Sequence, residues 1–382
     1  MKYAIIGAGG TGGTLGFYLT EAGKDVTLIA RGYHLEAMQK QGLTMRQLWD
    51  GKEETIPVKA CRMEEYTEQP DVILVCVKGY SLTDLIPDIR RIAGPETVVL
   101  PILNIYGTGG RLQKEFPDLT VPDGCIYVSA AIEEPGVILR HGRILRVVFG
   151  ARTPSEETES MRAIARDMLS ENLEVILSPD IRRDAMVKFS YVSPIGTAGL
   201  YYNATAVDFQ QEGEKREMIC ELMREIVNLS HAMGIEFEED LVERNLKILS
   251  NLAPESTTSM QRDVMAGKQS EIDGLVYEVV RMGREYGVPM SEYEKAAVQF
   301  QNHGISQIGS CLKIQIIHAG SRHDRPCMSV RYDPRHLIDP LHQNAAKKSA
   351  VTVDMLIHDE IGILRAGILH VLHLSHNFSL FL

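Results

Sequence analysis

A glycine-rich turn near the amino terminus carries the most chemically specific pattern in the chain. Gly7, Gly9 and Gly12 have the spacing GxGxxG, between an apolar run at 3–6 and a helical pattern at 11–22. In such a strand–turn–helix unit the first glycine permits the tight turn, the second lets a pyrophosphate approach the backbone, and the third lets the helix pack on the strand. The free N–H groups of the helix then attract phosphates. The pattern predicts a dinucleotide-binding loop, and a glycine-rich turn without a ligand is the weaker alternative.

The type of dinucleotide is indicated at the end of the second predicted strand, 25–30. NAD-binding proteins usually place a carboxylate there, but this chain has Arg31 and no carboxylate until Glu36. A guanidinium can bind a 2′-phosphate through two hydrogen bonds, which favours NADP over NAD. Lys78 follows the apolar run 71–77 and is a second cation at the same edge of the predicted sheet. The plain alternatives are a surface arginine that ends a strand and a solvated loop lysine.

These residues need a parallel sheet with helices on both faces to position them. Apolar runs at 3–6, 25–30, 71–77 and 97–103 alternate with helical patterns at 11–22, 33–41 and 82–92. Such alternation predicts an α/β fold with an N-terminal Rossmann-type doubly wound sheet. Two further strand-like runs, 125–132 and 138–150, flank a turn at 134–136, and we expect them to extend the sheet with antiparallel neighbours. A helix at 155–170 would close this first domain.

Strand patterns stop near residue 180, and helical patterns follow. The segment 214–233 has an apolar stripe with a period of 3.6 residues, and 238–251 and 271–286 read as further helices. We therefore predict three regions: an NADP-binding domain at 1–178, an all-helical substrate and catalytic domain at 179–302, and an atypical C-terminal extension at 303–382. For the extension, an added element, a disordered segment and a frame-shifted reading of the gene stay open.

Composition and charge exclude several classes of function. The chain has 382 residues, enough for about two domains of ~150 residues each. Its net charge of −11 argues against a nucleic-acid surface. No leader-like segment precedes the first strand and no apolar run has the ~18 residues of a membrane span, so we expect a cytoplasmic protein.

Cysteines and histidines give little support to a metal site. The cysteines stand at 61, 76, 125, 220, 311 and 327, and none forms a CxxC pair. His370, His373 and His376 stand three residues apart, but on a helix the first and third point well apart and no acidic or cysteine ligand accompanies them. We predict no metal.

Several segments together resemble the ketopantoate reductase (2-dehydropantoate 2-reductase) family. They are GAGGTGG at 7–13, Arg31, VKGYS at 77–81, LN at 103–104, the segment around Lys188, and SMQRDVMAGKQSEID at 259–273. The resemblance runs from residue 1 to about residue 300, and its last segment is the most specific. It implies NADPH-dependent reduction of a 2-keto acid to a 2-hydroxy acid, namely 2-dehydropantoate to pantoate in pantothenate and coenzyme A biosynthesis. It also implies a site in the cleft between two domains and is compatible with a homodimer.

The resemblance assigns a role to each matching residue. Lys188 would be the general acid, Glu271 would bind the substrate hydroxyl, and Ser259 would contact the substrate carboxylate. Asn104 would position the nicotinamide and the substrate. The dinucleotide would be held by Gly7, Gly9, Gly12, Arg31 and Lys78. The chemistry agrees, because hydride arriving at a ketone carbon leaves negative charge on the oxygen, and a protonated amine can stabilise that charge and supply the proton.

Two departures from the family pattern fall near the expected substrate cleft. The family usually has an asparagine one turn after the catalytic lysine, where this chain has Val192 followed by Ser193. It also usually has a glycine directly after the asparagine, where this chain has Ile105. A different 2-keto acid is therefore an alternative substrate, since a lost amide changes which substrates a site can bind. A non-catalytic NADP-binding sensor is the third hypothesis.

Overall fold

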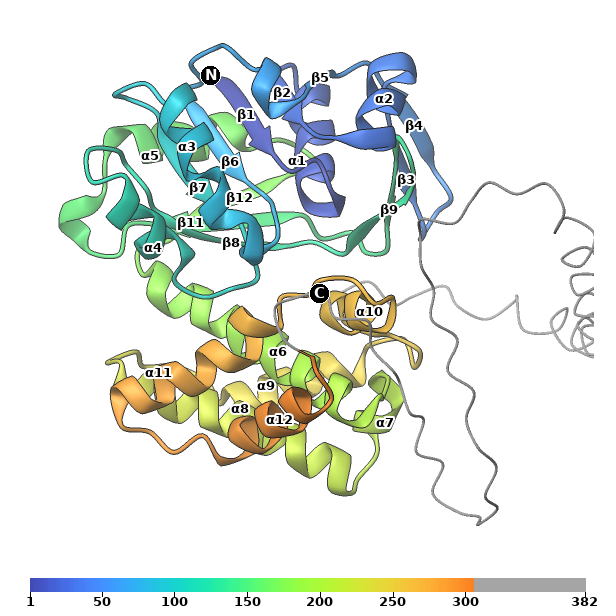
Figure 1. Cartoon of the computed structure of the whole chain (residues 1–382), viewed down its shortest axis with the longest axis vertical. Coiled ribbons are helices and arrows are strands. Elements are labelled where there is room, and N and C mark those ends of the chain that lie inside the picture. Colours follow the sequence, from blue (N-terminus) through green and yellow to red (C-terminus); the bar gives the residue numbers. More distant parts are fainter. Residues whose placement is uncertain (306–382) are drawn as a thin grey trace, which may run out of the picture. The chain divides into compact units, whose positions relative to one another are not determined.

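The computed structural model describes residues 1–305, which belong to one compact unit. In this part of the chain a domain built on sheets comes first and a helical domain follows, and helix α6 (Ile181–Tyr202) runs from one into the other (Figure 1). Residues 306–382, with the three closely spaced histidines and most of the predicted extension, lie outside the described residues.

A parallel five-stranded sheet forms the centre of the first domain, in the order β5-β2-β1-β6-β7. Its strands are β1 (Lys2–Ile6), β2 (Asp25–Ile29), β5 (Lys59–Cys61), β6 (Val72–Val75) and β7 (Val98–Pro101). The helices that accompany it are α1 (Gly10–Glu21), α2 (Gly32–Gln41), α3 (Leu82–Ile92) and α4 (Thr108–Glu115). The strand order reverses at β1 and β6, and ligands of such sheets bind where the carboxyl ends of these strands diverge. The prediction of a Rossmann-type doubly wound sheet is confirmed.

Alternate side chains of β1 show that both faces of this sheet are covered. Tyr3 and Ile5 are buried in a core that includes residues of α1 and of α5 (Glu159–Met168). Ala4 is buried in a second core that includes residues of α3 and α4. Because successive side chains of a strand point to opposite faces, an unbroken apolar strand such as β1 needs helices on both sides.

The region between residues 120 and 178 differs from the prediction. Each of the two predicted strand runs is divided into two strands, and the pieces join two additional sheets rather than the central one. These sheets have the orders β4-β3-β10-β9 and β12-β11-β8. Their strands are β3 (Leu43–Gln47), β4 (Glu53–Ile56), β8 (Asp123–Tyr127), β9 (Ala130–Glu134), β10 (Val137–Arg140), β11 (Arg146–Gly150) and β12 (Glu174–Leu177). Strands β3, β4 and β5 were not predicted, since their short, mixed sequences carry no clear alternation.

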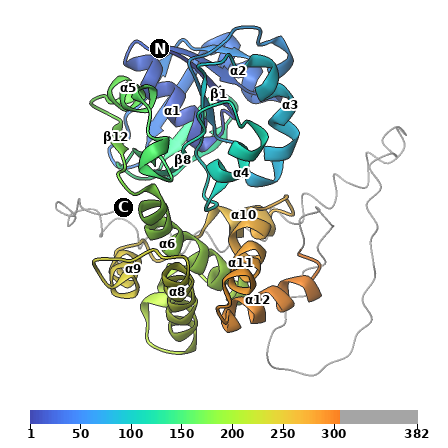
Figure 2. The ribbon, with the colours of Figure 1, turned by 90° about the vertical axis from the view of Figure 1, so that its left-hand side faces the viewer.

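Helices alone follow β12 in the described part of the chain, as predicted (Figure 2). After α6 they are α7 (Ala206–Gln210), α8 (Glu214–Ala232), α9 (Leu241–Ser250), α10 (Ser259–Met265), α11 (Glu278–Tyr286) and α12 (Ser291–Asn302). A π-helical turn, Asp273–Tyr277, leads directly into α11. The predicted stripe of α8 is buried, with Leu222, Ile226 and Leu229 fully enclosed. Short 3₁₀ turns occur at Met63–Glu65, Gly79–Ser81 and Pro154–Glu156.

Three global features of the described residues bear on the excluded classes. None of the helices up to residue 305 combines the length and apolar character needed to cross a membrane. The cysteines in this part, Cys61, Cys76, Cys125 and Cys220, are free thiols. No cluster of histidine, cysteine, aspartate or glutamate within residues 1–305 has the arrangement of a metal site.

Candidate active site

The glycine turn after β1 has the geometry that its spacing predicts. Gly7 has a φ of +97°, a conformation that L side chains rarely adopt. A Cβ atom on Gly12 would lie 2.1 Å from the carbonyl oxygen of Gly7, so only glycine lets α1 start this close to the strand. By contrast, apart from its neighbours in the chain, no atom lies within 4 Å of the position that a Cβ atom on Gly9 would take. Two glycines are thus needed by the fold, whereas Gly9 borders open space, where a pyrophosphate fits.

Backbone and side-chain bonds hold this turn against its neighbours. The N–H groups of Gly7 and Ala8 donate to the carbonyl oxygen of Ile29 at the end of β2, at 3.1 and 3.3 Å. His34 of α2 contacts the carbonyl oxygen of Ala8 through Nε2 at 2.9 Å, while its Nδ1 accepts the N–H of Gly136 at 2.9 Å. Since Nδ1 accepts, Nε2 must carry the proton that is donated to Ala8. The imidazole therefore fastens the glycine turn in one tautomer.

The surroundings of the turn suit an anion. Helix α1 has neither a side-chain cap nor an acidic residue in its first turn, so its N–H groups and positive dipole end are not neutralised by the helix itself. Arg31 precedes α2 as its N-cap residue and is exposed. Within residues 1–305 its side chain forms neither a hydrogen bond nor an ion pair. The edge of the sheet thus offers open space at Gly9, the uncapped start of α1 and the exposed guanidinium of Arg31 to a dinucleotide.

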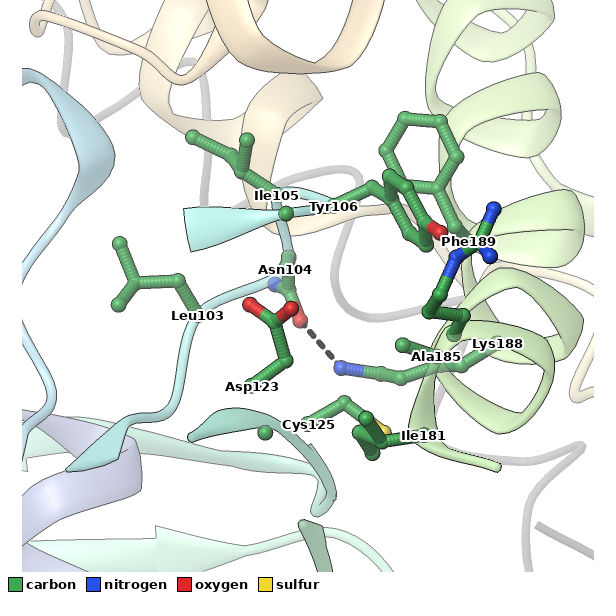
Figure 3. A pocket seen from close by; sticks show the side chains of 13 residues that line it. Leu103, Asn104, Ile105, Tyr106, Asp123, Cys125, Ile181, Ala185, Lys188 and Phe189 are labelled. Carbon is green, nitrogen blue, oxygen red and sulfur yellow. Dashed lines mark hydrogen bonds between the residues drawn. The ribbon is translucent and has the colours of Figure 1, made fainter. Parts of the chain in front are cut away.

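Lys188 and Asn104 meet where the two domains adjoin. Lys188 lies in the second turn of α6, which begins after Asp180, whose side chain accepts the N–H of Arg183 at 3.2 Å. Asn104 lies between β7 and α4. The Nζ atom of Lys188 donates to Oδ1 of Asn104 at 2.7 Å (Figure 3).

This pair lies at a small pocket, and mainly apolar and aromatic groups surround it. The lining residues are Leu103, Asn104, Ile105, Tyr106, Gly107, Asp123, Gly124, Cys125, Ile181, Arg182, Ala185, Lys188 and Phe189. Figure 3 shows the amine of Lys188 pointing from α6 toward Asn104. A cation held by a neutral amide, rather than by a carboxylate, stays available to donate to a second acceptor.

Burial changes the acidity of the amine. Its neighbours Met186 and Phe189 are buried, so the amine lies in a partly desolvated setting. Burial lowers the pKa of Lys188 below its ordinary value, although the nearby Cys125 and Glu271 oppose the shift. Desolvation has this effect because it disfavours the charged form of an amine. A lowered pKa makes an ammonium group a better proton donor near neutral pH.

Lys78 and Glu271 form a second contact across the domains. The Nζ atom of Lys78 lies 3.2 Å from Oε2 of Glu271 and 3.0 Å from Oδ2 of Asp263 on α10. Glu271 is only 5% exposed, and its Oε1 accepts the backbone N–H of Gly79 at 3.1 Å. Although burial works against it, the two carboxylates raise the pKa of Lys78. Lys78, which we expected to be available to the dinucleotide, therefore has two carboxylate partners. The contact with Asp263 was not predicted from the sequence.

Two family models match the chain. One, described as "Ketopantoate reductase PanE/ApbA", matches residues 3–154, and the other, described as "Ketopantoate reductase PanE/ApbA C terminal", matches residues 180–300. A 2-dehydropantoate 2-reductase from Mesorhizobium japonicum is 30% identical over 306 residues, which cover 74% of this chain and 92% of that protein. The chain belongs to the ketopantoate reductase family. It is an oxidoreductase of the 2-dehydropantoate 2-reductase-like type, which acts on CH–OH donors.

Solved structures of two ketopantoate reductases and of a D-mandelate dehydrogenase share this fold. A PanE/ApbA family ketopantoate reductase from Ralstonia eutropha has a TM-score of 0.71 at 23% identity, covering 79% of this chain and 98% of that one. A ternary structure of D-mandelate dehydrogenase with NADH and anilino(oxo)acetate has a TM-score of 0.70 at 21% identity, with 79% and 98% covered. A dimeric ketopantoate reductase from Staphylococcus aureus has a TM-score of 0.66 at 20% identity, with the same coverage. The D-mandelate dehydrogenase structure holds NADH.

Not every residue implied by the ketopantoate reductase resemblance joins these contacts. Ser259 is the first residue of α10, which Thr258 caps, and in the described part of the chain it forms no hydrogen bond with the other candidates. At the first departure, Val192 packs against the helical core, and the hydroxyl of Ser193 lies 2.6 Å from the carbonyl oxygen of Leu275. The structure thus brings together Lys188 with Asn104 and Lys78 with Glu271, whereas Ser259 forms no hydrogen bond with any of the four in the described part of the chain.

Proposed function

We propose that this protein reduces a 2-keto acid to a 2-hydroxy acid with NADPH, and that 2-dehydropantoate is the substrate. The product would be pantoate, for pantothenate and coenzyme A biosynthesis. One observation carries the proposal: the half-buried amine of Lys188 is held by the neutral side chain of Asn104 at 2.7 Å, at the junction of a dinucleotide-type domain and a helical domain. The names of the family and of its Mesorhizobium relative support the choice of substrate.

NADPH is the proposed cofactor because the cation at the end of β2 is unpaired within the described residues. Arg31 offers a guanidinium for a 2′-phosphate, and Gly9 and the start of α1 offer space and N–H groups for the pyrophosphate. Lys78 would add positive charge at the same sheet edge if cofactor binding draws it from its carboxylates. When bound, the cofactor supplies the hydride.

The protein's own groups then handle the charge that develops on the substrate. Protonated Lys188 would donate to the ketone oxygen and give up its proton as that oxygen gains negative charge. Asn104 would hold the amine by accepting one of its three N–H bonds, which leaves two for the substrate and solvent. Glu271 would accept from the substrate hydroxyl, since each of its oxygens keeps a further acceptor site beside Lys78 and Gly79. Ser259 would contact the substrate carboxylate.

A steady-state assay of NADPH oxidation tests this proposal. The substrates are 2-dehydropantoate and a panel of 2-keto acids with small, branched and aromatic side chains. We expect turnover with a clear preference for 2-dehydropantoate, and we expect the exposed-site variant Lys247→Ala to match the unmodified protein. A preference for another member of the panel would contradict 2-dehydropantoate as the substrate but would still support the reduction of a 2-keto acid. Tight NADPH binding without turnover of any 2-keto acid would reject the enzyme in favour of a sensor.

Two further proposals concern the setting of the reaction. A homodimer is proposed on the strength of the dimeric ketopantoate reductase from Staphylococcus aureus, and light scattering of the full chain tests it. A cytoplasmic location is proposed because the proposed substrate and cofactor are water-soluble molecules of biosynthesis. Fractionation of the native cell tests it.

A further inference from the structure

The side chain of Ile105 lies between two glycines that belong to different domains. Ile105 follows Asn104 in the segment between β7 and α4 and is only 7% exposed. A Cβ atom on Gly79 would lie 2.1 Å from its Cδ1 atom, and a Cβ atom on Gly274 would lie 2.3 Å from the same atom. Gly79 follows β6 in the sheet domain, whereas Gly274 lies in the π-helical turn of the helical domain. One methyl group therefore lies against both backbones, so a Cβ atom at either position would force the isoleucine side chain to shift.

Both glycines are adjacent to the ion pair of the candidate site. Gly79 donates its N–H to Glu271 and follows Lys78 in the chain, while Gly274 stands three residues after Glu271. Single π-helical turns inside helices occur frequently at functional sites. The chain neighbour of Ile105 on the other side is Asn104, which holds Lys188. The isoleucine thus lies next to both contacts that join the domains at the site.

We propose that Ile105 is a positioning residue that sets the spacing of the two domains and so keeps Glu271 and Asn104 in place around Lys188. Packed interfaces have little free volume, so a side chain enclosed by two backbones determines how closely they approach. Removing it would let the segment of Gly79 shift relative to Glu271, and adding a methyl group to either glycine would push the domains apart. Its role in catalysis rests on the proposed function, whereas its role in spacing does not.

The contacts around each glycine predict which substitution of Ile105 should restore the activity of the corresponding glycine-to-alanine variant. Near Gly79 the only close atom of the isoleucine is Cδ1, since Cγ1 would be 3.6 Å from the added Cβ. Ile105→Val, which lacks Cδ1, should therefore make room for Gly79→Ala. Near Gly274 the atoms Cγ1 and Cγ2 would also be close, at 2.6 and 3.0 Å. Gly274→Ala should therefore need Ile105→Ala, and Ile105→Val should not be enough.

The experiment measures kcat and KM for the 2-keto acid and the Kd of NADPH in the full-length single and double variants. We expect Ile105→Ala, Gly79→Ala and Gly274→Ala each to lower kcat/KM by about 10–100-fold, since small misplacements of catalytic groups have effects of this size. The fall should lie mainly in kcat, with the Kd of NADPH changed less than about 2-fold because the glycine turn is not in contact with Ile105. The matched control is Ile102→Ala, a buried isoleucine of the sheet-domain core whose loss removes the same side chain away from both glycines.

Hydrogen–deuterium exchange gives a readout that does not depend on turnover. The amide of Gly79, which is bonded to Glu271, should exchange faster in Ile105→Ala but not in Ile102→Ala. The two double variants are Gly79→Ala with Ile105→Val and Gly274→Ala with Ile105→Ala. Each should regain at least half of the kcat/KM lost in its glycine variant, on a logarithmic scale, and should slow this exchange again. Additive losses in both pairs, or unchanged exchange at Gly79, would overturn the proposal. If the unmodified protein reduces no 2-keto acid, the proposed function fails while the exchange measurement still decides the role of Ile105.

Discussion

The Nζ atom of Lys188 donates a 2.7 Å hydrogen bond to Oδ1 of Asn104, and this bond joins the helical domain to the loop after β7. The contrast with Lys78 is informative, because that amine faces two carboxylates at 3.0 and 3.2 Å. A carboxylate partner raises the pKa of a lysine, whereas burial beside a neutral amide lowers it. Of these two lysines, Lys188 is the one suited to give up a proton.

Replacing Lys188 should separate activity from stability. We expect Lys188→Met to lower kcat/KM by ~10²–10⁴, the usual contribution of a positioned acid. Burial disfavours the charged amine in the folded protein, so the lost hydrogen bond is partly offset and the free energy of unfolding should change by less than about 1 kcal/mol. Steady-state kinetics and urea unfolding measure the two quantities. Activity that survives within a few-fold would contradict the general-acid role.

The pH profile of kcat should report the same amine. Because Lys188 must be protonated to donate, the rate should fall as the pH rises through its pKa, which lies below the ordinary 10.5. Asn104→Asp places a negative charge next to the amine and should move this fall to higher pH, since an opposite charge favours the protonated form. Asn104→Ala lacks the charge and serves as the control. A shift of equal size in both variants would mean that the charge is not its cause.

Arg31 should discriminate between the two nicotinamide cofactors. We expect Arg31→Asp to weaken NADPH binding by at least ~10-fold more than NADH binding, because only NADPH has the 2′-phosphate that a guanidinium can bind. Fluorescence titration of both cofactors gives the two Kd values. Lys40→Asp, at the far end of the same helix, makes the same change in net charge and should affect both cofactors weakly. Equal losses of both cofactors in Arg31→Asp would reject the phosphate role.

Lys78 should contribute to the stability of the folded protein. Lys78→Met leaves the buried carboxylate of Glu271 without its ion-pair partner, which should lower the free energy of unfolding. The loss should stay below the ~3–5 kcal/mol of a fully buried pair, because the side chain of Lys78 is 36% exposed. Urea unfolding at neutral pH checks this, with the exposed-site variant Lys268→Met as control. A weaker NADPH affinity at unchanged stability would instead mean that the amine serves the cofactor alone.

His34 should make cofactor binding and stability sensitive to acid. Burial lowers the pKa of His34, and protonation would turn Nδ1 into a donor that faces the N–H of Gly136. The unfolded chain takes up this proton first, so the contribution of the neutral ring is present above about pH 6.5 and is lost as the pH falls through the lower, folded-state pKa. We expect Tm and NADPH affinity to decline together in that range.

Two variants control this prediction: a replacement of His34 that does not titrate, and the same replacement at a second, exposed histidine. His34→Asn should show a weaker decline in NADPH affinity with acid, because asparagine does not titrate. His231→Asn, at an exposed position of α8, should follow the unmodified protein. An identical acid profile in His34→Asn and the unmodified protein would contradict the role of the imidazole at the glycine turn.

Local patterns determined much of this protein from its sequence alone. The strand–turn–helix unit at Gly7–Gly12 and the buried stripe of α8 depend on backbone conformation and on periodicity, which neighbouring residues carry by themselves. Arg31 could likewise be placed at the end of β2, because a parallel strand has one carboxyl edge. The doubly wound sheet, though not the order of its strands, followed from alternating strands and helices.

Tertiary structure decided what depends on residues far apart in the chain. No local signal assigns β9 and β10 to one sheet and β8 and β11 to another, since apolar runs of similar composition fit either. Lys78 meets Glu271 across 193 residues, and its pairing with carboxylates rather than solvent comes from the packing of two domains. The place of Ile105 between Gly79 and Gly274 has the same origin. A sequence specifies which groups are present, but distances between domains arise only when their surfaces pack together.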